Sequence, residues 1–132
     1  MSLMFLLTII GVIFGYSFLN SDNSNTAKFI SELKGHDLKV KDITKEVRKE
    51  MPQLDLKTAV LMVEENERVY IENPVSAEES IKELIPVLTN PSVDFTGIPH
   101  LYQQDELVIS YFGQNKKLLS ALEEILGKSL VE

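Results

Sequence analysis

The segment from Phe95 to Gly127 is the most regularly patterned part of the chain, and the other elements can be placed around it. It reads FTGIPHLY (95–102), QQDE (103–106), LVISYF (107–112), Gly113 and then a helix-like run to Gly127. A proline opens the first apolar stretch and a polar turn separates it from the second, a pattern typical of a β-hairpin. The last run repeats its leucines at helical spacing. The segment therefore predicts a loop, a strand, a turn, a strand and an amphipathic helix.

The residues before this segment predict alternating helices and strands. Residues 58–63 form a continuous apolar run, which indicates a strand buried on both faces and central in its sheet. Ser76 and Glu79 form a capping-box pattern at the start of a helix, and Pro86 is expected to kink or shorten that helix. The remaining predictions are a helix over 26–34, a strand over 37–42, a helix over 43–51 and a strand over 68–72.

Composition limits the chemistry of the chain. Its 132 residues include 13 Lys and Arg against 20 Asp and Glu, a formal net charge of −7, which argues against nucleic-acid binding. The chain has no cysteine, so disulfides, thiolate nucleophiles and cysteine-ligated metals are excluded. The length after the first 20 residues suits one domain, which we place at residues 27–132.

Residues 3–19 form an uncharged, largely apolar segment of 17 residues. As a helix it would span about 25 Å, so residues 1–20 are predicted to be a membrane anchor. A cleaved signal, processed near Gly15 or Ser17, and a buried core helix are the alternatives. No Lys or Arg follows the segment until Lys28, which favours an extracytoplasmic domain, secreted if the signal is cleaved. Residues 21–26 are rich in Ser and Asn and predict a linker.

The order of elements, with Gly97-Ile98-Pro99 before a hairpin and a terminal amphipathic helix, resembles the thioredoxin-like fold. The resemblance covers about the last 95 residues in element order but only residues 95–126 in motif. It implies an α/β domain with a small mixed sheet, flanking helices and a cis bond before Pro99. The family's paired cysteines would fall at residues 42–45, where this chain has none. The resemblance thus implies a redox-inactive relative that uses the scaffold for binding.

The same resemblance places a groove for a peptide-like partner beside the proline. Ile98, Pro99 and His100 are therefore the predicted partner-binding residues, with no chemistry following. An ordinary trans proline that opens an edge strand is the alternative.

No catalytic, cofactor-binding or metal site is predicted from the residue types. His36 and His100 are the only histidines, and the carboxylates Glu64, Glu65 and Glu67 are interpreted as a solvated turn, as are Asp105 and Glu106. Four aromatic residues near the hairpin suit core packing better than a ligand-facing patch: Phe95, Tyr102, Tyr111 and Phe112.

Three functions fit these observations. The first is a non-catalytic, membrane-anchored or exported binding domain, with a protein partner in or at the membrane, such as a subunit of an envelope assembly. The second is an oligomer or fibre-like assembly packed through the N-terminal apolar helix. The third is a hydrolase or metal enzyme that uses His100 and carboxylates.

Overall fold

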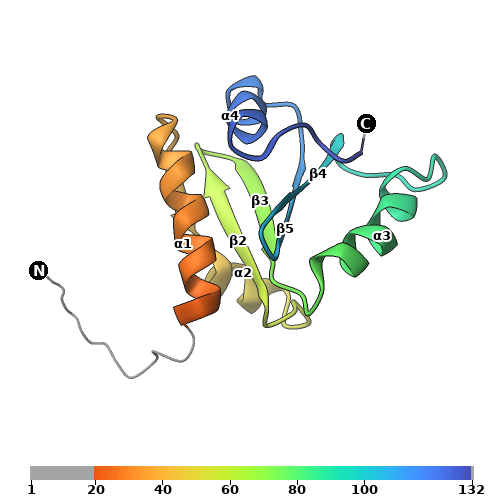
Figure 1. Cartoon of the computed structure of the whole chain (residues 1–132), viewed down its shortest axis with the longest axis horizontal. Coiled ribbons are helices and arrows are strands. Elements are labelled where there is room, and N and C mark those ends of the chain that lie inside the picture. Colours follow the sequence, from red (N-terminus) through yellow and green to blue (C-terminus); the bar gives the residue numbers. More distant parts are fainter. Residues whose placement is uncertain (1–19, 132) are drawn as a thin grey trace, which may run out of the picture.

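The computed structural model describes residues 20–131, with side chains from Asn25 onward, and contains four helices and five strands in this part of the chain (Figure 1). In chain order they are α1 (Asn20–Gly35), β1 (Val40–Asp42), α2 (Thr44–Glu50), β2 (Thr58–Val63), β3 (Glu67–Glu72), α3 (Ala77–Leu88), β4 (Pro99–Gln104), β5 (Leu107–Phe112) and α4 (Lys116–Leu126). The predicted hairpin and terminal helix are confirmed, as is the capped helix, in which Ser76 Oγ accepts a hydrogen bond from the Glu79 N–H at 3.2 Å.

The strands form one sheet in the order β1-β2-β3-β5-β4, and every neighbouring pair is antiparallel. The α/β class is confirmed, but the prediction of a mixed sheet is wrong. Side chains alternate between the two faces in the same way whichever direction a neighbouring strand runs, so the sequence pattern did not reveal strand direction. The apolar strand β2 is an interior strand, as expected, but β3 occupies the centre.

Two helices cover one face of the sheet. Phe29 and Leu33 from α1 and Leu118 and Leu122 from α4 are fully buried against it. The sheet contributes alternate residues from three neighbouring strands, so this face forms the main core: Leu61, Val63, Val69, Ile71, Leu107, Ile109 and Tyr111.

The opposite face is covered by two separate, smaller clusters. Near one edge of the sheet, Ile43 and Val47 pack on Val60 of β2. Near the other edge, Ile81 and Leu88 of α3 belong to a cluster with Leu101 and Val108. Figure 1 shows α3 on the side of the sheet away from α1. The middle of this face, along β3, is therefore covered less completely than the middle of the other face.

The N-terminal predictions are tested only in part. Helix α1 begins at Asn20, so residues 21–26, which were predicted to be a linker, are helical. Their polar composition did not distinguish a linker from the first turns of a helix, because Ser and Asn carry only a modest helix penalty. The predicted anchor at residues 3–19 lies outside the described residues, and none of the helices from residue 20 onward is long and apolar enough to span a bilayer. Pro86 lies inside α3, which ends two residues later at Leu88.

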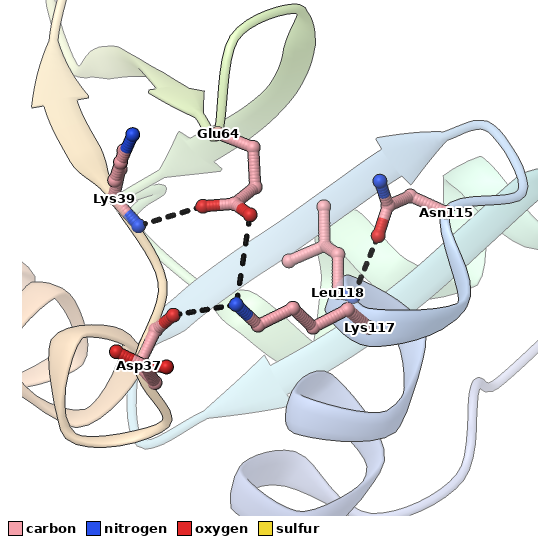
Figure 2. Close-up of polar contacts among 6 residues, drawn as sticks. All are labelled: Asp37, Lys39, Glu64, Asn115, Lys117 and Leu118. Atoms are coloured by element: carbon pink, nitrogen blue, oxygen red, sulfur yellow. Dashed lines mark hydrogen bonds and ion pairs between the residues drawn. The ribbon is translucent and has the colours of Figure 1, made fainter.

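At the Gly35 end of α1, a polar network joins the segment after α1, the turn between β2 and β3 and the start of α4 (Figure 2). Lys117 Nζ donates to the Asp37 carbonyl at 2.7 Å and lies 3.6 Å from Glu64 Oε1. Glu64 Oε2 accepts from the Lys39 N–H at 2.9 Å, and this bond, together with the Lys117 charge, lowers the pKa of Glu64. Asp37 and Glu64 have φ of 62° and 57°, in the left-handed region. The network thus stabilises two turns whose backbone conformations are unfavourable for non-glycine residues.

The first prediction concerns the apolar run of β2. Replacing the fully buried Leu61 with Asp should abolish cooperative unfolding, because it places an unpaired carboxylate in the main core at a cost of more than about 3 kcal/mol. Leu56→Asp is the matched control, since Leu56 is 86% exposed. Urea unfolding followed by circular dichroism measures both. A Leu61→Asp variant that unfolds like the parent chain would contradict the assignment of β2 as a buried interior strand.

Candidate functional site

The incompletely covered middle of the sheet forms the floor of a groove. Alternation along β3 directs Arg68, Tyr70 and Glu72 to the face opposite α1 and α4, and all three are half-buried. In the neighbouring strand β5, Ser110 lies opposite Tyr70, and Phe112 follows on the same face. The floor is therefore two strands wide and combines aromatic, hydroxyl and charged side chains.

The walls of the groove come from outside the sheet. Met51 and Leu54 follow α2 on one side, and Leu84 and Leu88 of α3 stand on the other. They enclose a cavity of about 360 Å³ that is open to solvent. A second hollow of about 250 Å³ near Arg68 borders Tyr70 and Phe112 as well, so the two hollows are neighbours on the same face of the sheet. We call this feature the β3 groove and define it by Met51, Leu54, Arg68, Tyr70, Glu72, Leu84, Leu88, Ser110 and Phe112.

Opposite charges mark the two ends of the β3 groove. Arg68 and Glu72 are four residues apart on one strand, which corresponds to about 13 Å. Within the described part of the chain, neither side chain has a hydrogen-bond or ion-pair partner. Burial raises the pKa of Glu72, and the nearby charge of Asp55 raises it further. A half-buried charge without a partner is costly, so these two groups are the ones best placed to bind something outside the domain.

A larger and more polar hollow, of about 620 Å³, lies between α2 and the start of β2. Several of its polar groups already bind one another. Arg48 donates to the carbonyls of Asp55, Leu56 and Thr58 at 3.4, 2.9 and 3.1 Å, and Asp42 Oδ1 accepts from the Thr44 N–H at 2.9 Å. These bonds hold the loop before β2 in place. We therefore regard this hollow as structural and the β3 groove as the candidate site.

His100 performs a structural role in this fold. Its Nε2 lies 3.0 Å from the Gly113 carbonyl oxygen, so that nitrogen must carry the proton and donate. Its ring stacks on Tyr111, with ring centroids 5.8 Å apart. A histidine held in this way gives no support to the hydrolase hypothesis.

Tyr111 connects β3, β5 and the start of α4. Its ring is fully buried, and its hydroxyl donates to Glu67 Oε1 at 2.5 Å and accepts from the Asn115 N–H at 2.9 Å. Burial, with the bond to Glu67 as the second cause, raises the pKa of Tyr111 to about 12. The hydroxyl is thus a neutral donor at physiological pH, and its function is to hold the hairpin and helix together.

The four aromatic residues near the hairpin do not form one patch. Tyr102 and Tyr111 lie in the main core, on the face covered by α1 and α4. Phe95 and Phe112 pack together on the groove face, with centroids 5.5 Å apart.

Sequence reasoning missed Tyr70, the aromatic residue at the middle of the groove. The signal available was its position in β3, between Val69 and Ile71, which are buried on the other face.

The predicted partner-binding residues lie where β4 begins at the edge of the sheet. Ile98 is half exposed, and Pro99 is the first residue of the strand. None of the peptide bonds in the described part of the chain is cis, so the expectation of a cis bond before Pro99 is wrong. A trans bond leaves the chain extended, with Pro99 opposite Phe112 and the Gly113 N–H donating to the Ile98 carbonyl at 3.0 Å. The proline motif therefore gives no support to the thioredoxin-like resemblance.

The outer edge of β4 is also partly occupied. The Leu101 N–H donates to Ser129 Oγ at 3.0 Å, and the Leu101 carbonyl accepts from the Leu130 N–H at 2.7 Å. Pro99, two residues before, faces the same edge and has no N–H to offer. Backbone pairing with a partner at Ile98, Pro99 and His100 stays a prediction, but few backbone N–H and carbonyl groups at this edge are free to form such pairs.

The other candidate side chains are separated by the fold. Glu64 binds Lys39 and Lys117, whereas Glu67 binds Tyr111. Asp105 lies 3.8 Å from Lys28 of α1. Among residues 20–131, no three His, Asp or Glu side chains are grouped closely enough to hold a metal ion. His36 and His100 are thus not brought together in a metal site.

No protein-family model, curated protein or solved structure matches this chain significantly. The candidate site is therefore assigned from the geometry of its own residues.

The second prediction concerns the close approach of the loop before β4 to β5. A Cβ at Gly97 would lie 2.8 Å from the backbone carbon and oxygen of Phe112. Gly97→Ala should therefore lower the free energy of unfolding by more than about 1 kcal/mol, because backbone atoms must shift. Gly35→Ala is the control, since a Cβ at Gly35 has nothing within 4 Å. Equal stabilities of the two variants in urea would contradict the packing of this loop.

The third prediction follows from the raised pKa of Glu72. In the unfolded chain a glutamate loses its proton near pH 4.3, whereas folded Glu72 holds its proton to higher pH, so stability falls as pH rises through this interval. Glu72→Gln removes this pH-dependent loss of stability, because glutamine does not titrate. The melting temperature of the variant minus that of the parent should be more positive at pH 7 than at pH 3.5. Glu83→Gln, at an exposed position on α3, is the control. A difference that does not change with pH would contradict the burial of Glu72 in the groove.

Proposed function

We propose that this chain is a non-catalytic, membrane-tethered binding domain whose β3 groove holds an apolar segment of a protein partner. The observation that carries the proposal is an apolar groove, open to solvent, with unpaired charges of opposite sign at its ends. Apolar surface in a concave site is favourable to cover, and charged groups at its ends give an occupant its direction.

The dimensions of the groove favour a single protein segment as the occupant. The floor is two strands wide, about 5 Å from strand to strand, and is recessed between the Met51–Leu54 wall and α3. A flat face of another domain would meet those walls before it reached Tyr70. Two residues four positions apart in an extended segment match the distance of about 13 Å between Arg68 and Glu72. We expect an acidic side chain beside Arg68 and a basic one beside Glu72 and Asp55.

The membrane tether is supported by the sequence of residues 3–19, which are uncharged and largely apolar. The lack of Lys and Arg between this segment and Lys28 favours a domain outside the cytoplasm. The partner would then be a protein in or at the same membrane.

The fourth prediction tests the groove directly. Peptides selected from a random phage-displayed library on the full chain in lipid nanodiscs should carry apolar residues between an acidic and a basic residue. Ser110→Phe should weaken their binding about tenfold or more, because the added ring occupies the middle of the floor opposite Tyr70. Ser120→Phe, on the exposed side of α4, is the matched control and should leave binding unchanged.

A charge reversal tests the direction in which the peptide lies in the groove. The double variant Arg68→Glu with Glu72→Arg should select peptides whose acidic and basic residues are exchanged in order, because each end of the groove then attracts the opposite charge. Binding that survives Ser110→Phe but is lost with Pro99→Ala or His100→Ala would reject the groove and favour the edge of β4.

A further inference from the structure

Two loops meet at the end of the sheet where β2 begins and β3 ends. These strands are antiparallel, with Thr58 opposite Glu72, so the segment before β2 and the segment after β3 emerge side by side. The Asn73 N–H donates to the Lys57 carbonyl at 3.2 Å and joins the two loops beyond the last strand pair. Leu56 and Val75 lie in these loops, next to this connection.

Leu56 and Val75 are the two most exposed large apolar side chains in the part of the chain that the structure describes, at 86% and 92%. Single exposed apolar residues are common on protein surfaces, but these two lie in loops that the Asn73–Lys57 hydrogen bond joins, at one end of the sheet. We call Leu56 and Val75 the loop rim.

Both loops are held by bonds within the domain. The guanidinium of Arg48 donates to the carbonyls of Asp55, Leu56 and Thr58, and Asp55 Oδ1 accepts from the Lys57 N–H at 2.7 Å. Val75 lies between Pro74, whose φ is fixed by its ring, and Ser76, which caps α3. The exposure of these side chains is therefore fixed by ordered backbone.

The loop rim lies at the end of the domain from which the chain leads back to residues 3–19. Thr26 of α1 borders the same hollow as Leu56 and Asn73, and α1 extends six residues before Thr26, or about 9 Å. In Figure 1 the start of α1 and these loops lie at the same end of the molecule. Asn20 directly follows Leu19, the last residue of the apolar segment.

We infer that the loop rim contacts the lipid bilayer, with Leu56 and Val75 inserted at the level of the headgroups and upper acyl chains. This inference rests on the membrane tether in the proposed function, and it adds the orientation of the domain on the membrane. The partner of the rim is the bilayer surface itself, because the apolar tether would hold this end of the domain closest to it. The net charge of −7 disfavours attraction to anionic lipid, so the contact depends on insertion of the apolar side chains.

The absence of cysteine allows a direct test with single-cysteine variants of the full chain. Leu56→Cys and Val75→Cys, each labelled with the fluorophore NBD, are reconstituted into phosphatidylcholine vesicles with and without doxyl-labelled phosphatidylcholine. Glu65→Cys, in the exposed turn at the opposite end of β2, and Val87→Cys, a half-exposed apolar site about 15 Å along α3, are the controls. Quenching by the doxyl lipid at positions 56 and 75 should exceed that at 65 and 87 by about twofold or more.

Flotation of the same vesicles distinguishes failure of the membrane tether from failure of the rim contact. A chain that floats with the vesicles but shows equal quenching at all four positions overturns the loop rim as a membrane contact and leaves the tether in place. A blue shift at 56 and 75 without quenching by doxyl lipid also overturns it, because protein then covers the rim. A chain that does not float rejects the membrane tether and the rim contact together. Melting curves of the labelled variants that match the parent establish that each is folded.

Discussion

The sheet has apolar side chains on both faces, and this constraint determines where the rest of the chain must lie. On one face, α1 and α4 bury most of the side chains of β2, β3 and β5, including Leu61, Val69 and Ile109. On the other face, α2 covers β2 and α3 covers β4 and β5, but no helix lies over β3. The uncovered strip becomes the β3 groove, so the site is a consequence of how four helices are distributed over two faces.

The polar side chains divide into two groups that differ in their partners. Tyr111, Glu67, Lys117 and Glu64 bind one another or nearby backbone groups, and they hold the hairpins, the α1–β1 loop and α4 together. Arg68 and Glu72, which alternate with buried residues of the same central strand, have no such partners in the described region. A polar group that the fold satisfies stabilises the scaffold, whereas one that the fold leaves unsatisfied is available for a ligand.

The β3 groove and the loop rim are separate apolar surfaces that share one structural element. The segment between α2 and β2 supplies Met51 and Leu54 to the groove wall and Leu56 to the rim, and Arg48 fixes its backbone. The proposed binding groove and the proposed membrane contact therefore both depend on the position of this one short loop.

The sequence by itself determined the elements whose signals are local. Alternation and apolar runs identified β2, β3 and β5, the Ser76–Glu79 pattern identified the start of α3, and Pro99 marked the first residue of an edge strand. Only the tertiary structure decided that all strand pairs are antiparallel, that residues 21–26 are helical, that Pro99 is trans and that Tyr70 faces Ser110 across the groove. The physical reason is the separation in sequence over which each interaction acts. Capping and periodicity act within a few residues, whereas the groove depends on the pairing of β3 with β5, which are separated in sequence by α3 and β4.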